Sequence, residues 1–456
     1  MTSSLEALSL EAPFVWDRHP QSAAEIDRLI GEAVTRSPQL GALAERLATE
    51  TSTRVTDWLD SVSGPVDVQE LIDLGFVEGH RTAPGVWRHP GAQLPAVIPA
   101  AGYRLGLRVD DAAAFAQAQR SAAPVAGSPL SGVRAVEVIT ENDVTVLGVE
   151  RRSWASGLVP TAFDAEDRAA AAEAWRTLAE RPRALTGADG VRAQRPAVQA
   201  AVALVGPDLA ASYFLQLERQ YWQRSNLAGL RQHARQDRLG LGWGNNDHHT
   251  FRSSRAAFAG LIELLTALGF ELRERFYAGA EAGWGAQVLE HPGCAGVIFA
   301  DVDLTPAEVE IDFAHAALTD VDGPDAEFGT VGMWCALHGE SVLEAGMHHL
   351  EGQFDFDGLR TDLAADGIAS MRPFSDFDHL RQAFTEAEVW PVPRERVEKL
   401  AADGHLDPRR ADELIRTGAA GSHLENLARR DGFKGFNQHN VSVTMKATHI
   451  RDYSPV

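Results

Sequence analysis

The sequence predicts an α+β protein in which a strand-helix-strand-strand-strand unit is repeated. Segments with apolar residues at helical spacing occur among segments in which apolar and polar residues alternate, and turn residues separate them. The chain also echoes itself, because "LIDLGFVEGH" (71–80) and "VWRHPGAQLPAVI" (86–98) resemble "LTALGFELRERF" (265–276) and "QVLEHPGCAGVIF" (287–299). Each half of the echo indicates a helix ending in Leu-Gly-Phe, a strand, a His-Pro-Gly turn and a second strand. A helix end plus a hairpin is a common unit, but the shared order and spacing favour a duplication.

Helices and strands are expected along the whole chain. Residues 21–50 predict two helices that break at Ser37-Pro38, and 164–184 and 196–237 predict further helices. Alternating patterns predict strands in "LPAVIPA", "YRLGLRV", "RAVEVIT" and "VTVLGVERR". From "GWGNNDH" onward, strands and helices alternate to the carboxyl end.

Composition narrows the class of protein. The 45% hydrophobic and 23% charged residues are typical of a soluble globular protein, and 456 residues exceed one ordinary core, so two or three domains are expected. A net charge of −22 argues against nucleic acid as a partner, since phosphate binding needs a basic surface. Two cysteines, Cys294 and Cys335, cannot form a disulfide scaffold or a cysteine-based metal cluster. The start "MTSSLEALSLEAPF" does not have the pattern of a signal peptide, and no run reaches the roughly 18 apolar residues of a membrane span. We expect a cytoplasmic protein without a membrane partner; the oligomeric state stays open.

The segment "DHHTFR" (247–252) is the first candidate for chemistry. In a strand, His248, Thr250 and Arg252 would point to one face, while His249 and Phe251 would point to the other. His248 can then hold a metal ion, and Arg252 can pair with a substrate carboxylate through its planar fork. The alternative is ordinary, because a single histidine is more often a structural residue.

Two further segments complete a possible ligand set. "GMHHLEGQFDFDGL" (346–359) predicts a short strand running into a helix, with His348 and His349 on opposite faces. "RQAFTEAEVW" (381–390) predicts a strand with Glu386 and Glu388 on one face, although Glu386 could equally be a solvated strand residue. Two histidines and one carboxylate leave half of an octahedral metal ion open, which suits Fe(II) and O₂ beside a chelating substrate.

At these residues the chain from about 240 to 456 resembles the 2-oxoadipate dioxygenase/decarboxylase family (D-2-hydroxyglutarate synthase) of the vicinal oxygen chelate superfamily. Four segments carry the resemblance, in the same order: "HHTFR", "HHLEG", "FTEAE" and "ARRDGFKGFN". The resemblance implies His248, His349 and Glu386 as metal ligands and Arg252 as the substrate clamp. It also implies βαβββ modules whose curved mixed sheets surround a metal cavity, with additional helices.

The activity implied by the resemblance is oxidative decarboxylation and hydroxylation of a 2-oxo acid by Fe(II) and O₂. For 2-oxoadipate the products would be 2-hydroxyglutarate and CO₂, with Thr250, Arg252 and Ser442 as candidate substrate-binding residues. Two alternatives stay open: a metal-dependent isomerase or lyase of the same superfamily that does not use O₂, and a small-molecule-binding protein without turnover.

The first half carries no histidine where the second half has its candidate ligands, since "TSTRVTDWLD" and "AGYRLGLRV" stand there. We therefore expect a metal-free module pair at 1–160, a helical connector at 161–240 and a metal-bearing catalytic domain at 241–456. His249 and His348 are expected to face away from the metal, and His423 is expected to be solvated.

Overall fold

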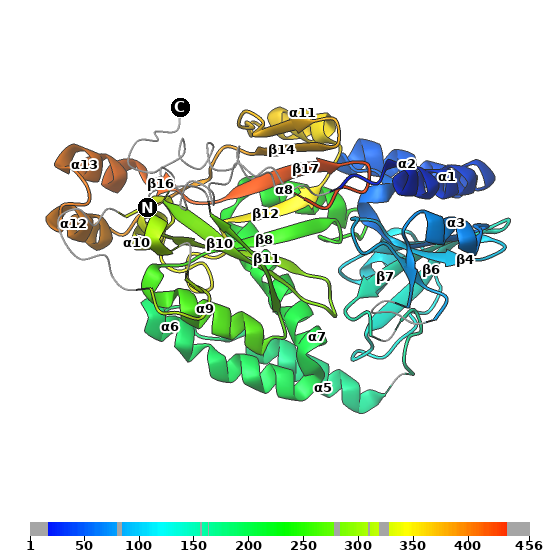
Figure 1. Cartoon of the computed structure of the whole chain (residues 1–456), viewed down its shortest axis with the longest axis horizontal. Helices are drawn as coiled ribbons and strands as arrows, with labels where there is room; N and C mark the ends of the chain where they lie inside the picture. Colours follow the sequence, from blue (N-terminus) through cyan, green and yellow to red (C-terminus); the bar gives the residue numbers. More distant parts are fainter. Residues whose placement is uncertain are drawn as a thin grey trace, which may run out of the picture.

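The structure, a computed structural model, describes residues 17–79, 84–155, 157–162, 164–277, 283–308, 311–318 and 328–435. Within these residues, two large mixed β-sheets are surrounded by helices, which confirms the α+β class. In Figure 1 the first sheet, in blue and cyan, lies on the right, and the second, green to red, lies on the left.

The first sheet has seven strands and two short helices: β1 (Leu59–Gly64), α3 (Val68–Asp73), β2 (Val77–Glu78), β3 (Trp87–Arg88), β4 (Ala96–Pro99), β5 (Tyr103–Arg108), α4 (Ala112–Ala118), β6 (Val133–Glu141) and β7 (Val144–Arg151). In each of its two modules the first strand is followed by a helix and pairs in parallel with the last strand, β1 with β4 and β5 with β7. β1 and β5 pair antiparallel and join the two modules.

The second sheet has eight strands and repeats this plan. Its elements are β8 (Asn246–Arg252), α9 (Arg255–Ala267), β9 (Glu271–Tyr277), β10 (Trp284–Glu290), β11 (Val297–Asp303), β12 (His349–Gln353), α11 (Phe356–Ala365), β13 (Ser375–Phe377), β14 (Leu380–Phe384) and β17 (His423–Arg429). β8 pairs in parallel with β11 and β12 with β17, while β8 and β12 pair antiparallel at the centre. The expected repeat is therefore present: among the described residues three modules have the order βαβββ, and the module β5–α4–β6–β7 has one strand fewer.

One insertion lies between β11 and β12, before the last module, and a second lies inside the last module, between β14 and β17. The helix α10 (Thr330–His338) precedes β12, and a small hairpin with two helices separates β14 from β17: β15 (Val389–Trp390), α12 (Arg394–Ala402), α13 (Pro408–Thr417) and β16 (Ala419–Ala420). The last insertion puts 38 residues between the end of β14 at Phe384 and the start of β17 at His423 (423 − 384 − 1). The strand that closes the module is thus distant in sequence from its neighbour.

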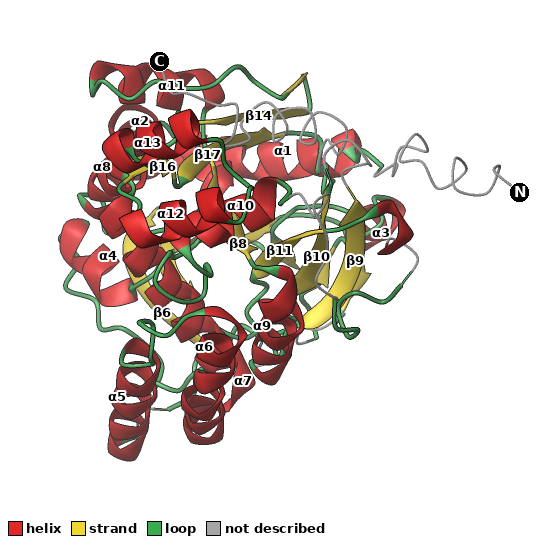
Figure 2. Ribbon diagram, turned by 90° about the vertical axis from the view of Figure 1, so that its left-hand side faces the viewer, coloured by secondary structure: helices red, strands yellow, loops and turns green. Residues whose placement is uncertain are grey.

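The remaining helices lie outside the sheets: α1 (Pro20–Arg36), α2 (Pro38–Thr51), α5 (Ala165–Ala179), α6 (Gly187–Ala193), α7 (Arg195–Trp222) and α8 (Leu227–Asp237). The predicted break between α1 and α2 is confirmed, because the Ser37 side chain accepts a hydrogen bond from the Leu40 amide and begins α2. Figures 1 and 2 show α5, α6, α7 and α9 grouped along one side of the second sheet. Their apolar side chains and those of the sheet form the largest core.

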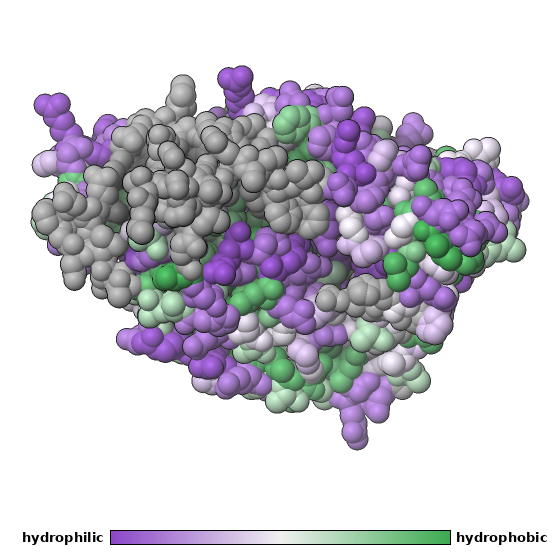
Figure 3. Space-filling view, in the orientation of Figure 1, coloured by the Kyte–Doolittle hydropathy of each residue, from purple (hydrophilic) through white to green (hydrophobic). Residues whose placement is uncertain are grey.

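One helical stretch, Gly187–Ser225, is apolar and long enough to cross a membrane, but 44% of its most apolar window is buried inside the molecule. A core helix of a soluble protein passes the same test. On the face that Figure 3 shows, hydrophilic side chains predominate and apolar ones occur in small groups.

The two repeated sequence segments form the same turn between a helix and the next strand in each sheet; we call this turn the corner. Gly75 and Gly269 follow α3 and α9 with positive φ values of 87° and 93°, a conformation that favours glycine. A Cβ atom on Gly75 would lie 2.7 Å from Nε2 of His89, and one on Gly269 would lie 2.8 Å from Nε2 of His291. These histidines belong to the two His-Pro-Gly turns, so each turn packs against the glycine of its own module.

Candidate metal centre

The candidate site lies on one face of three adjacent strands, β17, β12 and β8. Residues paired across a sheet share a face, as do residues two apart along a strand. His349 pairs with Thr250 and with His423, so these side chains point to the same face as His248 and Glu425. The sequence pattern predicted this alternation for β8.

The opposite face of β8 is covered by α7. The ring of Phe251 stacks on that of Phe214 with centroids 6.2 Å apart, and Nη1 of Arg219 lies 3.1 Å from Nε2 of His249. His249 therefore faces away from His248, in the helix-covered layer.

Three side chains bring possible ligand atoms together. Nε2 of His248 lies 3.1 Å from Nε2 of His349, and Oε2 of Glu425 lies 3.1 Å from Nε2 of His349 and 3.9 Å from Nε2 of His248. All three atoms lie within 4.8 Å of one another. Two imidazole nitrogens and a carboxylate oxygen directed at one point are a donor set that fits a divalent transition metal.

Neighbouring side chains hold these donors in place. Nδ1 of His248 lies 2.7 Å from Oε2 of Glu351, which leaves Nε2 directed at the shared point. The Gln382 amide donates to both carboxylates, at 2.9 Å to Glu351 and 3.2 Å to Glu425. Such second contacts orient metal ligands and raise their basicity.

A second group, Asp247, His248 and Glu351, also has ligand atoms within 4.8 Å. Its Asp247 carboxylate already forms an ion pair with Arg429, at 3.0 Å. Because an arginine neutralises one of its members, this group is better suited to orienting His248 than to holding an ion of its own.

Neighbouring carboxylates favour the protonated, positively charged form of His248. Burial acts to lower its pKa, but Glu351, Asp247 and Glu425 together raise it to about 10. Burial and the charge of Glu425 raise the pKa of Glu351 to about 8, and burial with the charge of His248 holds the pKa of His349 well below its usual range. A cation at the shared point would take the place of the proton on His248, so metal uptake should release protons.

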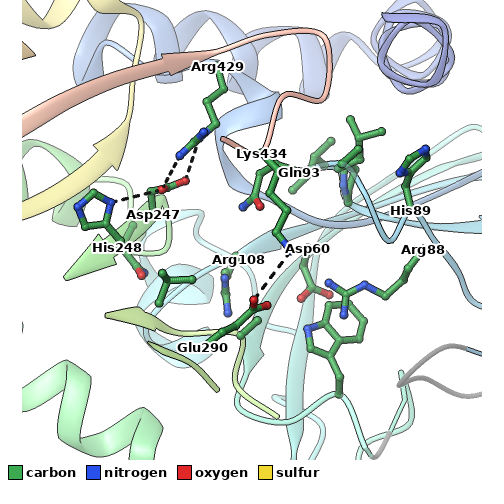
Figure 4. Close-up of a pocket in the computed structure, with 18 of the residues that line it drawn as sticks. Asp60, Arg88, His89, Gln93, Arg108, Asp247, His248, Glu290, Arg429 and Lys434 are labelled. Atoms are coloured by element: carbon green, nitrogen blue, oxygen red, sulfur yellow. Dashed lines mark hydrogen bonds and ion pairs between the residues drawn. The ribbon is translucent and has the colours of Figure 1, made fainter. Parts of the chain in front are cut away.

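Two cavities meet at His248. The smaller one, of about 50 Å³, is mostly apolar and also borders Thr250, Asp301, His349 and Glu425. Its aromatic wall consists of Phe276, Trp284, Phe299, Phe374 and Phe384. The larger one, of about 380 Å³, is lined with charged groups from both sheets, as Figure 4 shows.

Of the two other candidate residues on β8, Thr250 borders a cavity and Arg252 does not. The Thr250 hydroxyl lies 2.8 Å from Nε2 of His349 and borders the smaller cavity. Arg252 is buried and borders neither cavity; its Cα pairs with that of Asp301, whose side chain does border the smaller one. Burial lowers the pKa of Arg252 to about 10, so the guanidinium stays charged at neutral pH. Ser442 lies outside the described residues.

Glu386 does not lie with the two histidines, contrary to the expectation from the sequence. β14 ends at Phe384, and Glu386 is exposed in the loop that follows, outside both ligand groups. Phe384 pairs with Glu425 across the sheet, so the carboxylate comes from the neighbouring strand β17. The strand expected over "FTEAE" thus ends at Phe384, two residues before Glu386, because the chain turns there into the inserted hairpin.

The expectation for His423 was also wrong. It is 6% exposed on β17, and its Nδ1 lies 2.8 Å from the Thr385 carbonyl oxygen. A signal for β17 was present in the sequence, since His423-Leu424-Glu425 repeats His349-Leu350-Glu351. The two tripeptides pair residue by residue on parallel strands.

No known protein family matches the chain, and no curated protein matches it. Among solved structures, a 4-hydroxymandelate synthase variant from Streptomyces coelicolor is 15% identical, covers 76% of this chain and 95% of its own, and has a TM-score of 0.28. Methylmalonyl-CoA epimerase from Mycobacterium tuberculosis is 14% identical over 40% of this chain and 87% of its own, with a TM-score of 0.22. The uncharacterized protein YdcJ from Shigella flexneri is 15% identical over 59% of this chain and 84% of its own, with a TM-score of 0.24. At these values the matches assign neither a family nor an activity.

Proposed function

We propose that this protein is a non-haem Fe(II)-dependent dioxygenase that decarboxylates and hydroxylates a 2-oxo acid. The observation that carries the proposal is the convergence of His248, His349 and Glu425 at one point. Three ligands on one side of an ion leave the other side open, which is typical of non-haem Fe(II) oxygenases. When bound, Fe(II) supplies the open positions and the redox chemistry that activation of O₂ requires.

The ligand set replaces Glu386 of the sequence-based hypothesis by Glu425 and keeps the two histidines. In this proposal Gln382 orients the carboxylate, Glu351 orients His248, and Thr250 contacts His349 beside the smaller cavity. The aromatic wall of that cavity excludes water and suits O₂, which is small and apolar.

The reference reaction converts 2-oxoadipate and O₂ to 2-hydroxyglutarate and CO₂. The bond between C1 and C2 breaks, and C1 leaves as CO₂. One oxygen atom of O₂ enters the new carboxylate at C2, and the other becomes the hydroxyl group at C3, so atoms and electrons balance without another reductant.

The test is anaerobic reconstitution with Fe(II), followed by measurement of O₂ uptake over a panel of 2-oxo acids. With ¹⁸O₂ the expected hydroxy acid carries two labelled oxygen atoms and the CO₂ carries none. Glu425→Gln is the inactive variant, and Glu386→Gln is its matched control. Conversion without O₂ would indicate an isomerase or lyase, and binding without conversion would indicate a binding protein; either result would contradict the proposal.

A further inference from the structure

The larger cavity is lined by residues of both sheets and borders the candidate metal centre at His248. Asp60, Arg88 and Arg108 border it from the first sheet, while His248 and Glu290 border it from the second. The His-Pro-Gly turns of both sheets contribute as well, through His89 and Pro292. A volume of about 380 Å³ lies in the range of small-molecule sites, roughly 300–1,000 Å³.

Most of the charges around this cavity neutralise one another. Asp60 pairs with Arg151 at 2.7 Å, Asp247 pairs with Arg429 at 3.0 Å, and Glu290 lies 3.2 Å from Arg273. Figure 4 shows Lys434 also directed at Glu290. The carboxylates that border the cavity are thus each engaged by a cation, with Glu351 paired to His248.

Arg88 and Arg108 remain as excess positive charge. Across the part of the chain that the structure describes, neither forms an ion pair with a carboxylate. Burial lowers the pKa of Arg88 and that of Arg108, and the charge of Arg151 adds to this effect; the nearby Asp60 carboxylate acts to raise both pKa values, but it is paired with Arg151. One carboxylate thus faces three guanidinium groups, and Arg88 and Arg108 beside the cavity favour a further anion near them.

Both side chains are held in place by the fold. The guanidinium of Arg88, at the end of β3, lies over the ring of Trp154, 4.4 Å from its centroid. Stacking occupies the flat face of a guanidinium and leaves its N–H edges for an anion. Arg108, at the end of β5, donates to the Cys294 carbonyl oxygen at 2.8 Å and so bridges the two sheets.

We propose that Arg88 and Arg108 bind the distal anionic group, a carboxylate or a phosphate, of the substrate whose reacting end lies at His248. The assignment of the anion to a substrate rests on the proposed function, whereas anion binding by the cavity does not. The first half of the chain, which lacks the candidate metal ligands, thereby supplies part of the substrate site. The substrate class is an acid with a second anionic group several bonds from its reacting end.

The first experiment measures anion binding to metal-free protein, so its outcome does not depend on turnover. Isothermal titration with adipate, glutarate, inorganic phosphate and neutral hexanamide compares wild type with Arg88→Gln and Arg108→Gln. Arg104→Gln is the matched control, because Arg104 lies on β5 too but is exposed and paired with Glu137. Loss of one charge-assisted contact should weaken binding of the preferred anion by about tenfold or more, with the control unchanged.

Adipate or glutarate binding with little response to phosphate would identify a carboxylate as the distal group, and the reverse would identify a phosphate. Equal affinity of wild type and Arg88→Gln for every anion would overturn the proposal. If Arg108→Gln fails to fold, Arg88→Gln and Arg88→Lys still test the anion site. Lysine restores the positive charge, so Arg88→Lys should recover part of the affinity that Arg88→Gln loses.

The second experiment separates this proposal from the proposed function. In Fe(II)-loaded protein, Arg88→Gln should raise KM for 2-oxoadipate about tenfold or more and leave that for 2-oxohexanoate unchanged. Arg88-dependent anion binding without O₂ uptake by wild type would refute the dioxygenase and retain the anion site. O₂ uptake with an unchanged KM in Arg88→Gln would retain the dioxygenase and refute the anion site.

Discussion

The candidate metal centre depends on single side chains of β17, β12 and β8. Glu425 is 2% exposed and directed at His248 and His349, whereas Glu386 is exposed beyond the end of β14. The two glutamates therefore offer a direct comparison of the structural and the sequence-based ligand.

Glu425→Gln should lower the affinity for Fe(II) or Co(II) by about 100-fold or more, because losing even a supporting contact costs roughly 10–100-fold. Glu386→Gln should leave the affinity within about twofold of wild type, since a solvated surface group contributes little. Anaerobic titration with Co(II), followed by visible absorption, measures both. Tight metal binding by Glu425→Gln together with loss in Glu386→Gln would restore the sequence-based ligand set.

Arg252→Lys tests the substrate-clamp role that the family resemblance implies for this arginine, which is buried and borders neither cavity. The variant should keep metal binding, and kcat/KM should change by the same factor for 2-oxoadipate and for a neutral 2-oxo acid of similar length, because the distal anion is assigned to Arg88 and Arg108. A larger fall for 2-oxoadipate would support the sequence-based clamp, since lysine cannot reproduce a bidentate contact to a carboxylate, worth on the order of 1.5–3 kcal/mol.

At the scale of elements, the two corners after α3 and α9 specify the duplicated module. Both need a glycine with positive φ, and both place that glycine against the histidine of a His-Pro-Gly turn. The His291 ring, with Nε2 3.0 Å from the Leu268 carbonyl oxygen, ties the corner to the end of α9.

Gly269→Ala and Gly75→Ala should each reduce the free energy of unfolding by about 1–3 kcal/mol, through backbone strain and the contact with the histidine. Gly31→Ala is the control with the opposite sign. Gly31 is exposed in α1, and a Cβ atom added there would meet no neighbouring atom within 4 Å, so alanine should stabilise by roughly 0.5–1 kcal/mol. Urea unfolding measures all three, and a neutral effect of Gly269→Ala would contradict the proposed need for glycine.

At the scale of the whole molecule, buried histidines make stability sensitive to acid. His338 is an example outside the metal group: it is 6% exposed, Nε2 lies 3.0 Å from the Ala420 carbonyl oxygen, and burial lowers its pKa to about 3. In the unfolded chain the same group takes up a proton near its ordinary pKa of about 6.5. Between about pH 6.5 and pH 3 the unfolded state binds more protons, so the free energy of unfolding falls as the pH is lowered.

For His338 alone this loss amounts to about 2 kcal/mol between about pH 7 and pH 5. His338→Gln keeps a side-chain donor for Ala420 but has no titrating ring, so its stability should fall by about 2 kcal/mol less than that of wild type over this range. Urea unfolding at both pH values measures the difference. An identical pH dependence in the two proteins would show that His338 is not held neutral.

The sequence was sufficient for features that depend on local pattern. Alternation placed His248 and Thr250 on one face of β8 and His249 on the other, and the repeated Leu-Gly-Phe and His-Pro-Gly segments revealed the duplicated module. Such signals are readable because side chains alternate along a strand and because a corner with positive φ requires glycine.

The carboxylate that faces the histidines and the cavity between the sheets depend instead on strand pairing across long distances. The insertion after β14 separates neighbouring strands by 38 residues. The strand pattern and the family resemblance at "FTEAE" therefore indicated Glu386, whereas strand pairing places Glu425 in register with Glu351. Arg88 and Arg108 likewise lie about 150 residues before His248 on β8 and border the same cavity as His248 because the two sheets pack together. No local pattern encodes either contact, because both arise from the burial of surfaces that are far apart along the chain.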